Sequence, residues 1–314
     1  MYKNLVKIST VDMPHDEWLA HRTRSVGGSD AAAIVGLSKW ATPYSVWAEK
    51  LGYTPPAEDN EAMRQGRDLE DYVAQRFCEK EGKKVRRENH IIINPDFPFA
   101  HANVDRIVVG EAAGLECKTT SSLNLKKFKN GEFPDHYYVQ CVHYMMVTGA
   151  KRWYLAVLVF GKGFYTYCIE RDEAEIAALA KSEDTFWQYV LNKRPPMSDG
   201  EEATTDAIGA VYSEVTDTVC DLVMYESDLA ERQRLNGEIK TLKKLRDAAD
   251  NRIKSFMGNA GYGESDGFKV TWGQSERALF DRDRFTADHP GIDLTPYYNL
   301  TKSRTFRVTE RKES

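Results

Sequence analysis

The chain has 314 residues, of which 41% are hydrophobic and 29% are charged, a composition that is typical of a globular protein and excludes collagenous, fibrous and disordered chains. Its formal net charge of −5 at pH 7 argues against a simple nucleic-acid binder, although an enzyme that acts on DNA can gather its cations along one groove. No stretch approaches the ~18 uninterrupted apolar residues of a membrane span and no signal peptide is recognisable, so we expect no membrane contact and a cytoplasmic location.

Proline and glycine residues divide the first 80 residues into predicted helices. One helix follows Pro14 and ends before the glycine pair 27–28, and a second begins at Ser29. Thr42, an N-cap that is followed by proline, predicts a third, short helix. The apolar spacing then predicts a fourth helix over about 61–80.

The middle of the chain alternates predicted strands with predicted helices. Apolar and β-branched residues predict strands over 90–93, 102–109, 115–119, 152–160 and 164–170. Helices are expected over 135–147 and 173–191. The continuously apolar stretch 154–160 is typical of a strand buried at the centre of a sheet. The sequence therefore predicts an α/β fold in which helices flank both faces of a central mixed sheet, with strands around Asp105, Glu116, Tyr154 and Tyr167.

The proline pair 195–196 is the clearest boundary in the chain. An acidic linker is expected over 198–206, followed by a long amphipathic helix that ends at Gly258 and a last segment of short strands. Arg232 and Asn236 break the heptad of this helix, so we expect it to pack against its own chain or a neighbouring subunit. The predicted domains are residues 1–196 and a C-terminal extension, residues 197–314.

A short motif on two neighbouring strands points to chemistry. Glu116 and Lys118 are two residues apart on a strand and share one face, while Cys117 points to the opposite layer. With Asp105 on the neighbouring strand, two carboxylates can hold one hard divalent cation, and the lysine can orient or deprotonate a water. Hydrolysis of a phosphodiester needs these parts. Taken alone, such a set is more often an exposed edge strand with a salt bridge.

Two further residues favour the catalytic interpretation. Glu70 falls on the same helical face as Val73 and Phe77, where a buried carboxylate would need a cation. Gln140 places an amide near the same strands, although a surface glutamine explains it equally well. The order helix-Glu, strand-Asp, strand-Glu-x-Lys, helix-Gln is the order in which a nuclease core is built.

Five motifs in this order resemble one known family. They are residues 22–52 with Gly27-Gly-Ser29-Asp, Gly66-x-x-x-Glu70, Asp105, Glu116-Cys-Lys118 and Tyr138-x-Gln140. Over residues 15–190 the chain resembles the YqaJ-like viral recombinase family, relatives of lambda exonuclease within the PD-(D/E)xK nuclease superfamily. Val104 stands where the superfamily name has proline, which is not a ligand. The C-terminal third resembles the tail of phage members through Val270-Thr-Trp272 and Ser303-Arg304-x-Phe306.

The resemblance implies a restriction-endonuclease-like core and a Mg²⁺-dependent exonuclease. Such an enzyme enters a double-stranded DNA end, digests one strand from 5′ to 3′ and leaves a 3′ single strand for a single-strand annealing protein. It implies two Mg²⁺ ions, with Mn²⁺ as a substitute, and a homo-oligomeric ring such as a trimer. The basic residues of 126–129 and of the tail, 302–312, could line its channel. The protein would be encoded by a phage or prophage and act inside a bacterial host.

The resemblance also implies a set of metal ligands. Asp105 and Glu116 are the central ligands, and the backbone carbonyl of Cys117 is a further one. Glu70 supports the second metal.

Four other residues are assigned to catalysis and to the DNA end. Lys118 positions the attacking water, and Gln140 helps to orient Lys118 or the scissile group. Arg22 and Ser29 match the positions that hold the terminal 5′ phosphate. Independently of the resemblance, Ser29 follows two glycines at a helix start, where free N–H groups favour an anion.

Other functions and residues stay open. A PD-(D/E)xK endonuclease could use the same core, but the Arg22–Ser29 pocket and the lack of a sequence-reading module argue against it. A catalytically silent DNA-end-binding protein would have no use for the intact motif. A structural role is expected for His101 and His143 and a core position for Trp47, while Trp40 could pack in a core or stack on bases.

Overall fold

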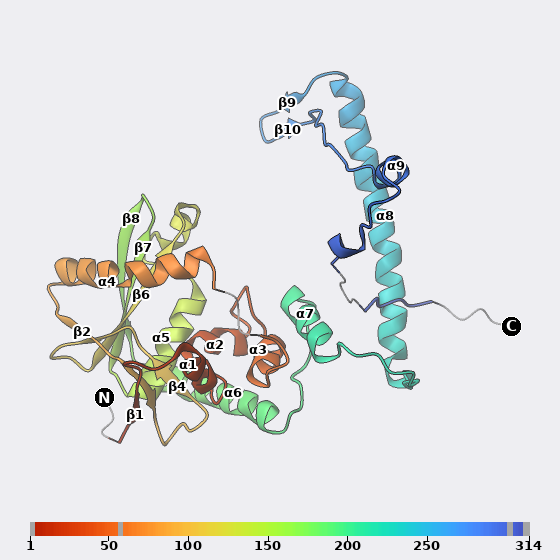
Figure 1. Cartoon of the computed structure of the whole chain (residues 1–314). Helices are drawn as coiled ribbons and strands as arrows, with labels where there is room; N and C mark the ends of the chain where they lie inside the picture. Colours follow the sequence, from red (N-terminus) through yellow and green to blue (C-terminus); the bar gives the residue numbers. More distant parts are fainter. Residues whose placement is uncertain (1–3, 56–58, 300–303, 310–314) are drawn as a thin grey trace. The chain divides into compact units, whose positions relative to one another are not determined.

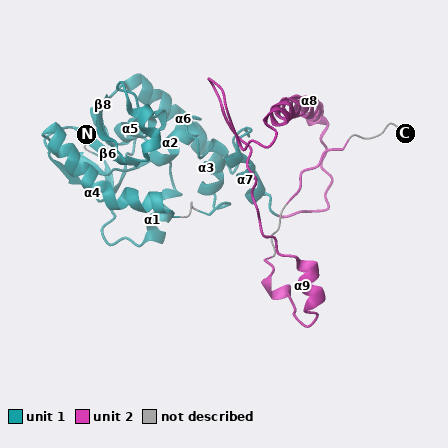
Figure 2. Cartoon of the chain, turned by 90° about the horizontal axis from the view of Figure 1, so that it is seen from above, with its two compact units in different colours: residues 1–213 teal, residues 214–314 magenta. Residues whose placement is uncertain are grey.

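The computed structural model describes residues 4–55, 59–299 and 304–309, and the chain divides into two compact units, Met1–Ser213 and Glu214–Ser314 (Figure 2). The sequence placed the boundary after Pro196 and an acidic linker over 198–206. In the structure, helix α7 (Glu202–Val211) begins inside that segment and packs on α3 (Pro43–Lys50). Thr204 and Ala207 are buried there, and the Thr204 hydroxyl lies 2.8 Å from that of Thr42. Burial of this face makes α7 part of the first unit.

A five-stranded mixed sheet forms the centre of the first unit (Figure 1). Its strands, in spatial order, are β2 (Val85–Arg87), β5 (Arg106–Val108), β6 (Ala113–Thr120), β7 (Arg152–Val159) and β8 (Gly163–Glu170). Strands β6 and β7 run parallel, and the other neighbours are antiparallel. The predicted α/β fold with a central mixed sheet is confirmed, and β7 is almost wholly buried as expected.

Helices cover both faces of this sheet (Figure 1). On one face, Val73 and Phe77 of α4 (Glu61–Glu81) pack against Leu115 of β6. On the other face lie α2 (Gly28–Ile34), α5 (Asp135–Thr148) and α6 (Glu173–Leu191), which share one apolar core with β7. The short helix α1 (His15–Arg22) precedes α2, and a 3₁₀ helix, η1 (Ser122–Phe128), follows β6.

A smaller antiparallel sheet adjoins the central one and fixes a corner in the chain. It contains β1 (Val6–Ser9), β3 (His90–Ile93) and β4 (His101–Asn103). The continuous strand expected over 102–109 is therefore split, because β4 pairs in the small sheet while β5 pairs in the central sheet. Val104 and Asp105 form the corner at which the chain passes from one sheet to the other.

The second unit is built on one long helix, α8 (Glu226–Met257), which has no buried residue. A short 3₁₀ helix, η2 (Val223–Tyr225), precedes it, and a hairpin of β9 (Tyr262–Glu264) and β10 (Lys269–Thr271) follows. Helix α9 (Arg282–Asp288) and η3 (Thr295–Tyr297) complete the described part. Lys302, Ser303, Arg311 and Lys312 lie outside the described residues. Among the helices that the structure describes, none is both long and apolar enough to cross a membrane.

Replacing Gly114 by Ala is expected to destabilise the first unit by about 1–3 kcal/mol, because the new methyl group would overpack the core. An ideal Cβ on Gly114 would lie 2.2 Å from the indole of Trp153, which is fully buried. The control is Gly209→Ala in α7, where a Cβ meets nothing and helix propensity predicts a gain of up to about 1 kcal/mol. Urea unfolding of both variants measures the difference, and equal midpoints would contradict the expected clash.

Candidate active site

Strand β6 presents Glu116 and Lys118 on one face. Leu115 and Cys117 pack on the α4 side of the strand, so the alternation along β6 turns their neighbours toward α5. Glu116 is buried, and its Oε1 lies 2.6 Å from the Lys118 Nζ. The structure thus holds the carboxylate and the amine side by side.

Asp105 joins this pair from the corner between the two sheets. The register pairs Arg106 of β5 with Leu115 of β6, which brings the preceding residue, Asp105, next to Glu116. The half-buried Asp105 accepts a 2.8 Å hydrogen bond at Oδ2 from the backbone N–H of Cys117. Asp105, Glu116 and Lys118 therefore form one group, the carboxylate–lysine cluster.

The charges of this cluster shift the pKa values of its members. The pKa of Asp105 is raised well above its usual value, first by loss of hydration and then by the negative charges of Glu116 and Glu70. The positive charge of Lys118 opposes this rise. Burial by itself would lower the pKa of Lys118, but the negative charges of Glu116 and Asp105 outweigh it and raise this pKa. Lys118 is therefore an ammonium, which donates hydrogen bonds to a water or a phosphate oxygen and does not accept a proton.

The cluster has features that suit a divalent cation. Among the residues that the structure describes, Glu116 Oε2 is buried without a hydrogen-bond partner, which costs free energy unless a cation or proton compensates. Carboxylate oxygens from two strands are the ligands that Mg²⁺ prefers, and this ion keeps several waters. No three His, Cys, Asp or Glu side chains of the described part are gathered into a group that could hold a metal. The unpartnered Glu116 Oε2 beside Asp105 would suit such an ion, and metal binding by these carboxylates and by the Cys117 carbonyl stays a prediction.

Glu70 lies close to the cluster but is paired elsewhere. It sits half-buried on the predicted face of α4 and forms an ion pair with Arg106. Arg106, only 4% exposed, also donates 2.6 Å hydrogen bonds to Asp71 Oδ1 and to the backbone carbonyl of Asp105. Arg106 was not identified from the sequence as a site residue. Its position directly after Asp105 was the one feature that could have indicated it. This guanidinium therefore ties α4 to the corner at Asp105.

Gln140 is bonded to a tyrosine of its own helix, α5. Its Nε2 donates a 2.7 Å hydrogen bond to the Tyr144 hydroxyl. The predicted role of Gln140, to orient Lys118 or the scissile group, stays a prediction. Burial, then the charges of Glu116 and Asp105, raise the pKa of Tyr144 well above its usual value. The ring of Tyr144 also touches the start of α2, because a Cβ on Gly28 would lie 2.6 Å from it.

Arg22 and Ser29, the predicted phosphate-binding residues, lie together at the junction of α1 and α2. Arg22 Nη2 donates a 3.0 Å hydrogen bond to Ser29 Oγ. The guanidinium also lies over the Trp18 ring, 5.1 Å from its centroid, and 3.9 Å from Asp30 Oδ1. The arginine is therefore held in place but half-exposed.

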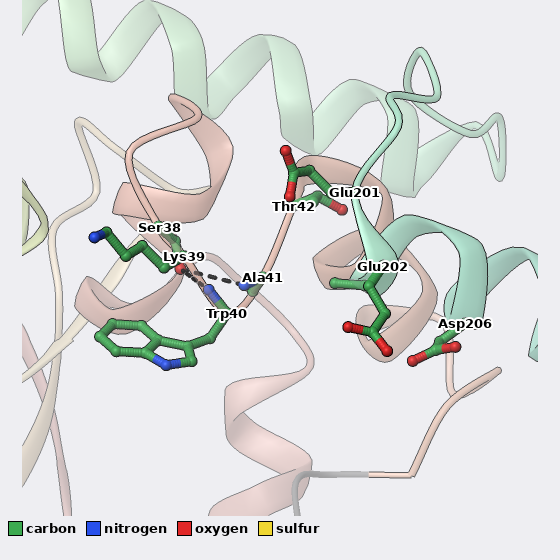
Figure 3. A pocket seen from close by; sticks show the side chains of 9 residues that line it. Ser38, Lys39, Trp40, Ala41, Thr42, Glu201, Glu202 and Asp206 are labelled. Atoms are coloured by element: carbon green, nitrogen blue, oxygen red, sulfur yellow. Dashed lines mark hydrogen bonds between the residues drawn. The ribbon is translucent and has the colours of Figure 1, made fainter. Parts of the chain in front are cut away.

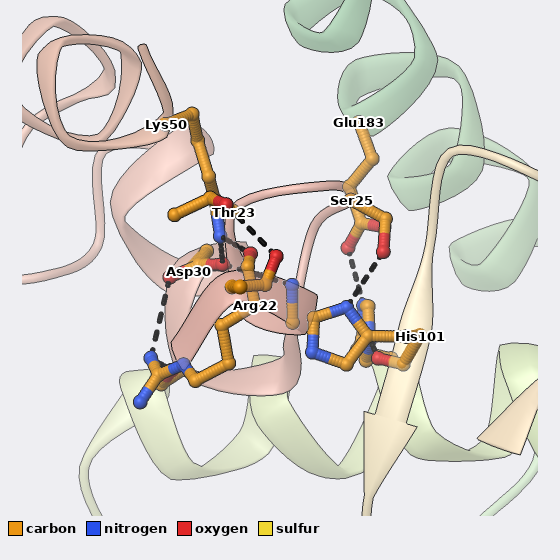
Figure 4. A network of polar contacts seen from close by, with 11 residues as sticks. Arg22, Thr23, Ser25, Asp30, Lys50, His101 and Glu183 are labelled. Carbon is orange, nitrogen blue, oxygen red and sulfur yellow. Dashed lines mark hydrogen bonds and ion pairs between the residues drawn. The ribbon is translucent and has the colours of Figure 1, made fainter. Parts of the chain in front are cut away.

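Asp30 and Lys50 brace this pocket (Figure 4). Asp30 Oδ2 accepts from Lys50 Nζ at 2.5 Å and from the Gly27 N–H at 2.8 Å, and the same Nζ donates to the Arg22 carbonyl at 2.7 Å. Burial alone would raise the pKa of Asp30, but Lys50 and Arg22 lower it. Sequence reasoning missed both residues, although Asp30 three positions after the N-cap Gly27 has the spacing of a capping box. Because Asp30 takes the Gly27 N–H, attraction for an anion rests on Arg22 and Ser29.

A cavity of about 250 Å³ lies beside Asp105 of the cluster. Trp18, the stacking partner of Arg22, lines it together with Glu70, Asp105 and Arg106. Asp105 therefore borders this cavity directly, whereas Arg22 is related to it only through its contact with Trp18.

A second cavity, of about 340 Å³, contains none of the predicted catalytic or phosphate-binding residues (Figure 3). Lys39 and Trp40 line one side, and the carboxylates of Glu201, Glu202 and Asp206 line the other. The carboxylates would repel a DNA backbone. Trp40 is 72% exposed, so it is not a core residue, whereas Trp47 is buried as expected.

The two histidines have structural roles, as expected from the sequence. His101 Nδ1 lies 2.8 Å from Ser25 Oγ, and burial and then Lys50 lower its pKa to about 3 (Figure 4). His143 bridges Glu183 and the backbone carbonyl of His101, each at 2.8 Å.

Comparisons with known proteins agree on the family and the fold. A family model described as YqaJ-like viral recombinase domain matches residues 17–151, which include every predicted site residue. The protein YqaJ of Bacillus subtilis (strain 168) is 37% identical over 308 residues, 96% of this chain and 95% of that protein. Among solved structures, LHK-Exo in complex with dAMP is 23% identical with a TM-score of 0.50, over 57% of this chain and 94% of that one. LHK-Exo is an alkaline exonuclease from Laribacter hongkongensis, and a second structure of it gives a TM-score of 0.49 at the same identity and coverage. The expected restriction-endonuclease-like core is thereby confirmed.

Replacing Asp105 by Asn is expected to stabilise the chain in EDTA at neutral pH. The folded-state pKa of Asp105 is raised, so the folded chain binds the proton more tightly, and the cost of the charged carboxylate grows as pH rises from about 3.8 through the folded-state pKa. Near pH 4 the Asn variant should have the same melting temperature as the wild type. At pH 8 its melting temperature should be higher, by about 2–4 °C for each kcal/mol of stability gained.

The exposed Asp96→Asn is the matched control, and its melting temperature should follow that of the wild type. Adding Mg²⁺ should raise the melting temperature of the wild type but not that of Asp105→Asn. A melting temperature of Asp105→Asn in EDTA that falls with rising pH, relative to the wild type, would contradict the assignment.

Proposed function

Because the chain belongs to the YqaJ-like viral recombinase family, we propose that it is a Mg²⁺-dependent exonuclease that digests linear double-stranded DNA from its 5′ ends. The observation that supports this most is the carboxylate–lysine cluster, with the buried and unpaired Glu116 Oε2 beside Asp105. The product would be a 3′ single strand for recombination by a single-strand annealing protein. The reaction would take place in the cytoplasm of a bacterial host, on phage or prophage DNA.

The positions of the residues support a role for each of them. Asp105 and Glu116 would hold the metal, with the Cys117 carbonyl and, after release from Arg106, Glu70 as further ligands. When bound, Mg²⁺ offsets charge on the non-bridging phosphate oxygens and acidifies the attacking water, and Mn²⁺ could replace it. Lys118, whose Nζ lies 5.5 Å from the centre of the Tyr137 ring and 2.6 Å from Glu116, would orient that water.

Strand polarity would follow from Arg22 and Ser29. Water attacks the phosphorus, the bond from phosphorus to O3′ breaks, and the first nucleotide leaves with its own 5′ phosphate and a 3′ hydroxyl. The phosphate that was attacked stays on the 5′ end of the next nucleotide. Each cycle therefore restores the end group that the Arg22–Ser29 pocket would bind.

A homo-oligomeric ring such as a trimer would keep this acidic protein on DNA during repeated cycles. Lys126, Lys127 and Lys129 lie in and just after η1, directly after the strand that carries the cluster. They would line the channel of such a ring and attract the DNA backbone.

Linear and covalently closed circular duplexes, each incubated with and without Mg²⁺, test the proposed function. Metal-dependent digestion of linear DNA alone supports the exonuclease. Cutting of circles would instead identify an endonuclease, and retention of DNA ends without any loss of DNA would identify a silent end-binding protein.

Replacing Lys118 by Ala should lower the cleavage rate by about 10² or more, because the group that orients the water is lost. Binding to DNA ends should persist, since Arg22 and Ser29 are unchanged. Lys162→Ala, in the exposed turn between β7 and β8, is the matched control and should keep the wild-type rate. Single-turnover assays on an end-labelled duplex measure both, and a wild-type rate for Lys118→Ala would remove it from the mechanism.

Replacing Arg22 by Ala should slow digestion of 5′-phosphorylated duplex by about 10- to 100-fold, the loss of one or two charge-assisted hydrogen bonds. Digestion of 5′-hydroxyl duplex should change little, because that end offers no terminal phosphate. Arg24→Ala, two residues away and exposed, serves as the control. Equal wild-type rates on the two ends, or first release of label from 3′ termini, would refute the pocket and the direction together.

A further inference from the structure

Helix α8 carries a stripe of apolar side chains that face solvent. Leu235, Ile239, Leu242, Ile253 and Phe256 are between 42% and 93% exposed. They lie on a helix of 32 residues, about 48 Å long, that forms the spine of the second unit (Figures 1 and 2). Because amphipathic helices owe most of their stability to packing of the apolar face, this stripe needs a surface to cover it.

The stripe repeats every seven residues, which is the pattern of a coiled coil. Its first core positions are Arg232, Ile239, Arg246 and Ile253, and its second core positions are Leu235, Leu242, Ala249 and Phe256. Apart from Arg232 and Arg246, every core position is apolar. The break expected at Asn236 falls outside the core, at a flanking position.

The two arginines favour one relative direction of the helices. In a parallel pair each core residue faces its own copy, so Arg232 and Arg246 would each meet an identical guanidinium away from water. In an antiparallel pair a first-position residue faces a second-position residue, and no two core arginines meet.

The charges along α8 favour the same direction. Residues 226–241 carry four acidic and three basic side chains, whereas residues 242–257 carry two acidic and five basic ones. Antiparallel packing brings the more acidic half of one helix against the more basic half of the other.

We propose that α8 is the docking surface for a second copy of this chain, and that the two helices form an antiparallel coiled coil centred at residue 244. In this register Leu235 faces Ile253 and Ile239 faces Ala249 of the second copy. On one flank Glu238 faces Arg252, and Leu245 faces its own copy across the two-fold axis. The like-charged Lys243 pair on the other flank lies at the solvent edge, where repulsion costs little. This pairing is independent of the proposed nuclease function, and its two-fold symmetry makes it a contact additional to a three-fold ring.

A cysteine at position 245 tests the pairing in the full-length protein. Cys168 and Cys220 are the exposed cysteines and are first replaced by Ser. Under mild oxidation, Leu245→Cys should form a disulfide-linked dimer at least about tenfold faster than Asn251→Cys, because position 251 points away from the partner helix. Equal rates would overturn the proposal, since they mean that α8 is covered by something other than a second α8. Faster cross-linking of Leu242→Cys than of Leu245→Cys would also overturn it, because it indicates a parallel pair.

Charge reversal tests the register. Glu238→Arg and Arg252→Glu should each weaken self-association by about tenfold or more, since each places like charges opposite each other, and the double variant should restore it. Sedimentation of the full chain over a range of concentrations measures the association. If the double variant associates as weakly as the single variants, the pairing of Glu238 with Arg252 is wrong.

Discussion

Two carboxylates held close together, Asp105 and Glu116, are the constraint on which the first unit depends. Like charges that lose water repel each other, and the surroundings offset this only in part. The Cys117 N–H donates to Asp105, Lys118 pairs with Glu116, and Arg106 pairs with Glu70. Two signs of uncompensated negative charge remain. Glu116 Oε2 has no hydrogen-bond partner, and the pKa of Asp105 is raised. An excess of negative charge at oxygen ligands is the condition that a hard divalent cation would satisfy.

The fold keeps this cluster at a fixed place relative to the Arg22–Ser29 pocket. Strand β4 links them, because His101 lies against Gly27 at the start of α2 and Asp105 follows four residues later at the corner between the sheets. Tyr144 gives a second link, since its ring touches Gly28 and its hydroxyl bonds to Gln140. A DNA end that reaches the arginine would therefore meet the carboxylates at a separation that packed elements determine.

The second unit differs from the first because its main helix, α8, has no buried core of its own. None of the α8 side chains is buried, and its apolar stripe is interrupted by Arg232 and Arg246 at core positions. Polar core residues lower the stability of a coiled coil but select its partner and direction. A pairing of this kind is suited to joining chains that are already folded.

Local patterns in the sequence determined the elements whose causes are local. The period of α4, the apolar run of β7 and the alternation that places Glu116 and Lys118 on one face all depend on neighbours along the chain. The corner at Asp105 could not be predicted, because residues 102–109 read as one strand and only pairing with β3 on one side and with β2 and β6 on the other divides them.

Contacts between residues far apart in the chain decided the features that local patterns could not predict. Helix α7 lies in a segment whose acidic composition is that of a linker, and its helix is held by burial against α3. Glu70 and Gln140 were placed on the correct helical faces, but their partners, Arg106 and Tyr144, are set by how α4 and α5 dock on the sheet. A side chain's face follows from its own helix, whereas its partner depends on contacts between residues far apart in the chain, which no local pattern encodes.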